Sequence, residues 1–240
     1  MLRARSDDPQ GAWEDLGQLY TGDGPAPAGG RPTAERPSVW AIDLTAGRIN
    51  GRLYAVWSGW ERAADTDKTP QLLYIAPMAG PTAIAGPRRV LSAPAAPWER
   101  GPELDLQEGP EFLQHGDPAR GGGTFLVYST RDSWLPTYAL GMLRYRGGDP
   151  TDSASWAKSA GPVFGAGNGV IGTGHNTFTV SPDGRQDWLV YHAKVGVEPG
   201  WRRDVHMQPF TWRADGAPDF GAPVPNGAPV AVPSGECGAG

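Results

Sequence analysis

Three polar residues, Asp43, Glu108 and His175, stand where their side chains could do chemistry. Asp43 lies in an apolar stretch, where an unpaired carboxylate is costly and therefore needs a partner or a function. Glu108 precedes a Gly-Pro pair, which removes a side chain and an N–H donor beside the carboxylate and leaves room for a ligand. His175 follows a glycine-rich segment, at the start of a predicted strand. These residue types suit acid–base chemistry or ion binding.

Each candidate also has an ordinary structural explanation. A lone acid in a strand is commonly solvated or salt-bridged, and a lone histidine is commonly a hydrogen-bonded structural residue. Other acids lie near Glu108 in the sequence. Glu111 is the weaker candidate, because in an extended strand its side chain faces the side opposite to Glu108. Composition alone does not rank Glu103 and Asp105 as candidates for the site. The remaining histidines of interest, His192 and His206, have no comparable setting in the sequence.

Two carboxylates that face one channel suit glycoside hydrolysis. One carboxyl group protonates the leaving oxygen. The other activates the attacking water or influences the charge state of the first. Several indoles are expected at strand ends or in loops that would rim such a pocket: Trp57, Trp60, Trp134 and Trp201. Stacking on a sugar and packing between sheets are both open explanations for each of them.

A repeated pair of strands must position these residues. The first strands of the three copies are predicted at 42–45, 108–113 and 175–180, and the second strands at 53–58, 125–129 and 188–192. A glycine-containing turn precedes each second strand, and the copies are about sixty to seventy residues apart, which suits a four-stranded propeller blade with long loops. Because the first strand of each blade lines the central channel, we expect Asp43, Glu108 and His175 to face one another.

The opening residues, 2–13, resemble the second half of a repeat, as found again in 143–156. The sequence therefore predicts an all-β propeller with about three and a half blades, whose chain begins in the middle of a blade. A complete but irregular all-β domain is the alternative. With 35 Gly and 25 Pro spread between strand patterns, the composition agrees with a turn-rich β domain.

The net charge and the hydropathy of the sequence give no support to nucleic acid or a membrane as a partner. A formal net charge of −5 gives no electrostatic reason to expect nucleic acid or an anionic membrane surface as a partner. No segment of the sequence reaches the apolar length of a membrane span.

Several motifs together resemble glycoside hydrolase family 43, the five-bladed propeller family of arabinofuranosidases and xylosidases. The resemblance extends from about residue 2 to residue 236 and implies one propeller domain, 1–240, that lacks its first one to one and a half blades. The motifs that carry it are 40–43 (WAID), 53–61 (LYAVWSGWE), 73–78 (LYIAPM), 108–110 (EGP), 174–176 (GHN), 187–192 (DWLVYH) and 208–212 (QPFTW).

The resemblance also implies roles for individual residues. Glu108 corresponds to the general acid, and Asp43 to the aspartate that orients this acid and raises its pKa. His175 corresponds to a channel histidine associated with a central ion, often calcium held through water. Arg203 resembles an arginine that holds the acid site or the substrate. Apart from the resemblance, Trp60 and Trp134 are expected to bind substrate because of their positions at strand ends or in loops.

One family feature has no counterpart in the chain. Family members carry an aspartate, the general base, on the first strand of the first blade, and an Ala-Pro-Glu segment in the second blade; neither is present. We expect an inverting enzyme that removes terminal α-L-arabinofuranosyl or β-xylosyl residues from arabinose- or xylose-containing plant polysaccharide, and little activity from the isolated chain. The alternatives are a non-catalytic carbohydrate-binding propeller and a protein-interaction propeller, the last of which would not bring the carboxylates together.

Overall fold

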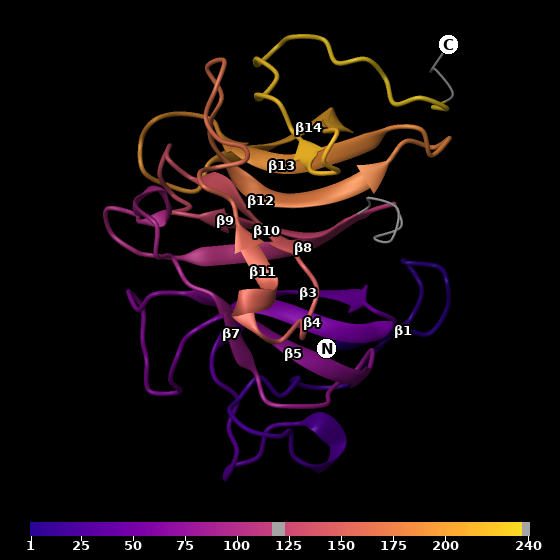
Figure 1. Cartoon of the computed structure of the whole chain (residues 1–240), viewed down its shortest axis with the longest axis vertical. Helices are drawn as coiled ribbons and strands as arrows, with labels where there is room; N and C mark the ends of the chain where they lie inside the picture. Colours follow the sequence, from indigo (N-terminus) through magenta and orange to yellow (C-terminus); the bar gives the residue numbers. More distant parts are fainter. Residues whose placement is uncertain (117–122, 237–240) are drawn as a thin grey trace.

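The computed structural model describes residues 1–116 and 123–236 and consists of strands joined by turns and short 3-10 helices. Three antiparallel sheets follow one another along the chain, from the indigo end to the yellow end in Figure 1. The 3-10 helices are η1 (Ala28–Gly30), η2 (Pro97–Glu99) and η4 (Ser153–Ser155). In this part of the chain no helix combines the length and apolar character of a membrane span.

The first sheet has the strand order β3-β4-β5-β6, and β7 pairs with β5 beside it. Its strands are β3 (Ala41–Ile49), β4 (Arg52–Gly59), β5 (Leu72–Gly80), β6 (Ala83–Ile84) and β7 (Arg89–Ser92). Asn50 and Gly51 connect β3 to β4 with φ angles of 50° and 77°. Two consecutive residues with positive φ make the tight turn that matches the twist of a hairpin.

The second and third sheets repeat this pattern with the orders β8-β9-β10-β11 and β12-β13-β14-β15. Their strands are β8 (Gln107–His115), β9 (Gly123–Thr130), β10 (Ala139–Tyr145), β11 (Trp156–Lys158), β12 (Ile171–Val180), β13 (Asp187–Lys194), β14 (Arg203–Trp212) and β15 (Pro218–Asp219). All six predicted first and second strands are confirmed. The turn predicted before β9 falls partly on residues 117–122, outside the described residues.

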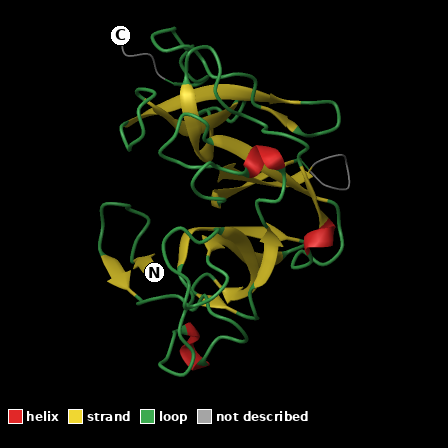
Figure 2. Ribbon diagram, turned by 90° about the vertical axis from the view of Figure 1, so that its left-hand side faces the viewer, coloured by secondary structure: helices red, strands yellow, loops and turns green. Residues whose placement is uncertain are grey.

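A two-stranded hairpin of β1 (Leu2–Ala4) and β2 (Trp13–Asp15) precedes the sheets and lies to one side of them in Figure 2. It resembles the β10–β11 pair in detail. The Trp13 indole N–H donates to the Pro9 carbonyl at 3.2 Å, as the Trp156 indole N–H donates to the Pro150 carbonyl at 2.9 Å. The likeness of residues 2–13 to the outer half of a repeat is thereby confirmed.

The hydrophobic core lies between neighbouring sheets. One cluster joins the first and second sheets and includes Val56, Ile75, Leu126 and Tyr128. The next joins the second and third sheets, with Val127 and Leu140 packed among residues of β13 and β14. Since adjacent residues of β9, Leu126 and Val127, point to opposite faces, the second sheet is buried on both sides, as a blade inside a propeller is.

One end of the three sheets gathers the elements that build the site. The strands β3, β8 and β12 begin at this end. The antiparallel partners β4, β9 and β13 finish there, so the loops 60–71, 131–138 and 195–202 leave from the same end. Side chains far apart in the sequence are thereby brought to one surface.

Candidate active site

The first strand of each of the three large sheets is interrupted by a bulge near this end. The register shifts occur between Ile42 and Thr45, between Glu108 and Glu111, and within Gly174–Thr177. Inside each bulge one residue has a positive φ, namely Asp43 at 56°, Gly109 at 53° and His175 at 53°. A bulge bends its strand and re-aims a side chain, and positive φ is uncommon for residues other than glycine.

The three bulges meet. The Gly109 N–H donates to Asp43 Oδ2 at 3.0 Å, and His175 Nε2 lies 3.9 Å from Asp43 Oδ1. A Cβ on Gly109 would lie only 3.2 Å from His175 Nδ1, so the absence of a side chain lets the imidazole approach the backbone. Glu108 immediately precedes Gly109. The structure therefore brings Asp43, Glu108 and His175 to one place, as expected, while their chemical roles stay predictions.

Glu108 is almost entirely buried, with 8% of its surface exposed. The Tyr138 hydroxyl donates to Glu108 Oε1 at 2.7 Å. Burial raises the pKa of Glu108 above its ordinary value, and the Asp43 carboxylate raises it further, whereas hydrogen bonds from Tyr138 and Ser133 and the nearby His175 pull it down. The net increase keeps Glu108 protonated to a higher pH, which suits a proton donor.

A stack of rings supports this carboxyl group. Tyr138 lies nearly parallel to His192, with ring centroids 5.5 Å apart and an interplanar angle of 7°. His192 in turn stacks on His175 at 6.1 Å. Burial and the positive charge of Arg203 lower the pKa of His192 to about 3, so its ring is neutral. The expectation that His192 has no setting comparable to that of His175 is wrong, because strand pairing places it beside the site.

Sequence reasoning missed Tyr138, Ser129 and His192 as site residues. The Ser129 hydroxyl accepts the His175 backbone N–H at 2.7 Å and so fixes the bulge. Ser129 and His192 hold equivalent positions near the ends of β9 and β13, each directly after the aligned tyrosine of the repeat. A polar residue directly after the aligned tyrosine of the second and third repeats is the sequence signal that could have identified Ser129 and His192. Tyr138, in a loop, offers no such signal.

The residues expected to bind substrate lie in two groups. Trp60 stacks on Trp40, with centroids 4.5 Å apart and planes inclined by 20°. Trp134 lies 5.8 Å from Trp201 at an angle of 55°. Arg203 donates from Nη2 to the Ser133 carbonyl at 2.7 Å and therefore sits one residue from Trp134. The other nearby acids form exposed ion pairs: Glu103 with Lys68, and Asp105 with Arg100.

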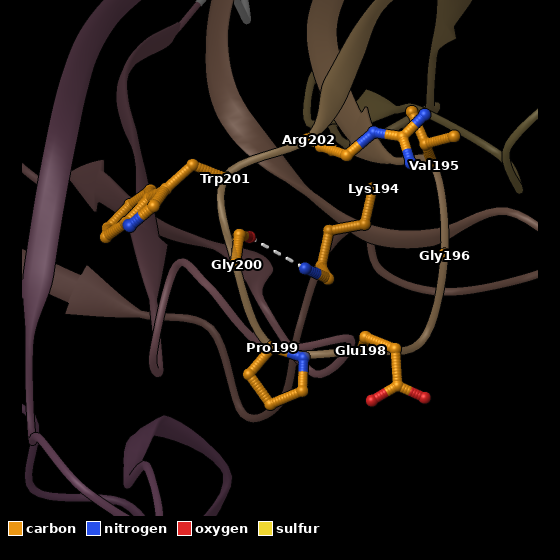
Figure 3. Close-up of a pocket in the computed structure, with 8 residues that line it drawn as sticks. All are labelled: Lys194, Val195, Gly196, Glu198, Pro199, Gly200, Trp201 and Arg202. Atoms are coloured by element: carbon orange, nitrogen blue, oxygen red, sulfur yellow. Dashed lines mark hydrogen bonds between the residues drawn. The ribbon is translucent and has the colours of Figure 1, made fainter.

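Two hollows open among these elements. One, of about 290 Å³, is lined by Asp43 and Trp57 together with residues of the segment before β3, including Gln18 and Leu19. The other, of about 170 Å³, lies inside the β13–β14 loop, where Lys194 Nζ donates to the Gly200 carbonyl at 2.8 Å (Figure 3). The first touches the candidate site directly through Asp43.

The groups around His175 offer few donors for a metal ion. Within residues 1–116 and 123–236, no group of three or more His, Cys, Asp or Glu side chains is arranged to hold a metal ion. Calcium takes six to eight oxygen ligands, whereas the side chain facing His175 contributes one carboxylate, that of Asp43. Direct coordination by side chains does not fit, and a calcium ion held through water stays a prediction.

The comparisons with known proteins agree with this geometry. Residues 1–218 match the family model described as Glycosyl hydrolases family 43. The chain belongs to this family. The predicted membership in glycoside hydrolase family 43 and the predicted all-β propeller architecture are confirmed, while the total of five blades stays a prediction.

Related family 43 proteins carry arabinofuranosidase names. The extracellular exo-alpha-(1->5)-L-arabinofuranosidase of Streptomyces avermitilis is 35% identical over 226 residues, covering 90% of this chain and 42% of the relative. Alpha-L-arabinofuranosidase 43 of Humicola insolens is 36% identical over 198 residues, covering 79% and 39%. The crystal structure of alpha-L-arabinofuranosidase from Lactobacillus brevis has a TM-score of 0.75 at 32% identity, covering 93% and 65%. The chain thus spans less than half the length of these curated relatives.

Proposed function

We propose that this site belongs to an inverting glycoside hydrolase that removes terminal α-L-arabinofuranosyl residues from plant cell-wall polysaccharide. The observation that carries the proposal is the environment of Glu108. This carboxyl group is buried, its pKa is raised, and Asp43 lies beside it, hydrogen-bonded to the next residue of the chain. Glu108 then acts as the general acid, and the negative charge of Asp43 disfavours its ionisation.

The reaction divides between two carboxyl groups on opposite faces of the sugar. Glu108 protonates the glycosidic oxygen as the bond to the leaving group breaks. In an inverting enzyme a second carboxylate, about 6.5–9.5 Å away, takes a proton from the attacking water. No residue of this chain is assigned to that second role. The chain therefore supplies the acid half of the mechanism, and we expect little turnover from it alone.

Arabinofuranosyl is preferred over β-xylosyl as the sugar removed. The support comes from the curated relatives, which are named arabinofuranosidases. A non-catalytic carbohydrate-binding propeller is the second candidate, favoured by the partly exposed indole pairs near the site. The contact of Asp43 with Gly109 argues against the protein-interaction propeller, which predicted separated carboxylates.

The test is hydrolysis of nitrophenyl α-L-arabinofuranoside and nitrophenyl β-D-xyloside. Both the 240-residue chain and a version extended at its N-terminus are assayed, each with and without Glu108→Gln. We expect the extended protein to cleave the arabinofuranoside with inversion and to lose this activity in Glu108→Gln. If the extended protein binds arabino-oligosaccharides without cleaving either substrate, the binding propeller is correct. Turnover by the chain alone, lost in Glu108→Gln, would show that the base lies within it.

A further inference from the structure

A buried arginine, Arg88, lies where three segments of the chain meet. It directly precedes β7, and 3% of its side chain is exposed. Nη1 donates to the Trp60 carbonyl at 2.7 Å, and Nη2 donates to the Glu61 carbonyl at 2.6 Å. Nε donates to Asp23 Oδ1 at 2.8 Å. Arginine is rarely buried without specific partners, and two of these three partners lie at the start of the β4–β5 loop.

Two tyrosines fix the orientation of this guanidinium. The central carbon of the Arg88 guanidinium lies 4.2 Å from the centre of the Tyr74 ring, which belongs to β5. The Tyr20 hydroxyl donates to the Asp23 carbonyl at 2.5 Å, and Tyr20 is buried. The body of the first sheet and a buried anchor before β3 therefore hold the guanidinium in one orientation.

The two carbonyls that Arg88 holds belong to the rim of the candidate site. Trp60 follows β4, and its backbone N–H donates to the Trp40 carbonyl at 3.2 Å. The indole of Trp60 stacks on that of Trp40, which is partly exposed and lies three residues before Asp43. The placement of this indole pair beside Asp43 therefore depends on how the carbonyl side of Trp60 is held.

The carbonyl bonds hold the rim more firmly than the ion pair does. The side chain of Asp23 is 74% exposed, and an ion pair with so hydrated a carboxylate contributes little. The two carbonyl acceptors come from adjacent residues, Trp60 and Glu61, and the planar fork of a guanidinium can bind both at once. The ammonium group of a lysine is a point charge and lacks this fork.

We propose that Arg88 is a positioning residue, whose guanidinium fork holds the Trp60 and Glu61 carbonyls and so fixes the Trp40–Trp60 pair at the rim beside Asp43. The inference rests on the proposed function for its catalytic consequence: Arg88 acts on substrate binding through the rim, and not on Glu108. The structural part of the inference, the hold on the indole pair, can be measured without any turnover.

The first test is circular dichroism of the stacked indoles. Two indoles at this separation couple their electronic transitions and give a pair of bands of opposite sign, which Trp60→Phe should abolish and thereby assign. We expect Arg88→Met to lose at least about half of this signal because both carbonyl bonds are deleted. Arg88→Lys should keep an intermediate signal. Asp23→Asn, which removes only the ion pair, should leave the signal unchanged.

Gln208→Leu is the matched control for a general loss of stability. The Gln208 side chain is also buried, and its Nε2 also donates to two loop carbonyls, those of Phe220 and Ala222, but in the third sheet. Melting temperatures show how far each variant is destabilised. At a similar loss of melting temperature, Gln208→Leu should retain the indole signal that Arg88→Met loses.

The second test is steady-state hydrolysis of nitrophenyl α-L-arabinofuranoside by the N-terminally extended protein. We expect Arg88→Met to raise KM by about three- to tenfold and to change kcat by less than about twofold, since binding is impaired while the acid is untouched. Arg88→Lys should recover part of the loss in KM, and Asp23→Asn should behave as the wild type.

The outcomes separate this inference from the function on which it rests. An indole signal that is unchanged in Arg88→Met, or lost equally in Gln208→Leu, would overturn the positioning role. A fall in kcat at constant KM would overturn its action through the rim. If the extended wild-type protein hydrolyses nothing, the proposed function fails, while the indole signal still decides whether Arg88 holds the pair.

Discussion

At the scale of single residues, the site depends on opposing influences on one carboxyl group. Burial and the Asp43 carboxylate raise the pKa of Glu108, while Tyr138, His175 and Ser133 lower it. A proton donor needs its acidic form at working pH, but it must also release the proton during the reaction. The neighbours of Glu108 therefore tune its acidity in both directions, and each can be removed by a nearly isosteric substitution.

Asp43→Asn removes the negative charge beside Glu108. Asparagine tolerates positive φ and can still accept the Gly109 N–H, so the bulge should remain. Since a nearby negative charge disfavours ionisation, its removal should lower the pKa of Glu108. The shift is measured by NMR titration of the glutamate carboxyl carbons. Asp105→Asn, at an exposed pair with Arg100, is the control and should leave Glu108 unchanged.

Tyr138→Phe should act in the opposite direction. The Tyr138 hydroxyl donates to Glu108 and favours its ionised form, so deleting the hydroxyl should raise the pKa of Glu108 further. The same titration measures the effect. Tyr191→Phe deletes another buried hydroxyl, one bonded to Gln208, and serves as the matched control. A pKa of Glu108 that falls in Tyr138→Phe would contradict this account of its environment.

At the scale of secondary structure, the repeated bulge is the element that builds the site. In the bulges that meet at the site, the residues with positive φ are Asp43 in β3, Gly109 in β8 and His175 in β12. A regular strand would alternate its side chains between the two faces of the sheet. The bulge in each strand instead turns these residues toward one another, and the glycine gives the histidine room.

Gly109→Ala should destabilise the protein by about 2–3 kcal/mol, because it adds both positive-φ strain and a Cβ close to His175. Gly51→Ala provides the control, since Gly51 has a φ of 77° and open space around its missing Cβ, and should cost about 1 kcal/mol. Urea denaturation measures both values. In a double-mutant cycle, His175→Ala should recover part of the loss in Gly109→Ala; strictly additive costs would refute the crowding.

At the scale of the whole molecule, a buried carboxylate fastens two sheets together. Glu99, in η2 between the first and second sheets, is fully buried and accepts hydrogen bonds from Gln107, Tyr128 and Lys158. Lys158, on the outer strand β11, also donates to the Ala93 carbonyl just after β7. The network joins the end of the first sheet to the inner and outer strands of the second. Loss of the network should lower the free energy of unfolding of the whole domain.

Lys158→Met should lower the free energy of unfolding by about 2–3 kcal/mol near neutral pH, because it leaves a buried carboxylate without its cation. The estimate is at the low end for buried pairs since the Lys158 side chain is 26% exposed. Arg144→Met, which breaks an exposed pair with Asp215, is the control and should change stability by less than about 1 kcal/mol. Equal losses in the two variants would argue against the network.

The same network predicts a dependence of stability on pH. Burial alone would raise the pKa of Glu99, but Lys158, the Ala96 N–H and Tyr128 together hold it below the ordinary value of 4.5. The folded protein therefore binds this proton less readily than the unfolded chain. The stabilisation is fully present above about pH 4.5 and is lost as the pH falls through the folded-state pKa. Lys158→Met should raise the folded-state pKa of Glu99, so the fall in unfolding free energy on acidification should be smaller than in the wild type, which acid titration of the unfolding free energy would reveal.

The strands and the candidate acids can be predicted from local features of the sequence. Alternating residues and glycine turns are local signals, so the repeated strand pairs and the half repeat at residues 2–13 could be recognised from the sequence. A repeat that forms blades also implies that its first strands share one channel. From that rule alone, Asp43, Glu108 and His175 were expected together.

How these residues meet, and what surrounds them, depends on contacts between segments that are far apart in the chain. The bulges depend on contacts between sheets, such as the Gly109 N–H with Asp43 and the His175 N–H with Ser129. The roles of Tyr138 and His192 likewise arise because loops and neighbouring strands close over Glu108. Burial and hydrogen bonding across sheets set the pKa of a carboxyl group, and neither is encoded in the residues next to it along the chain.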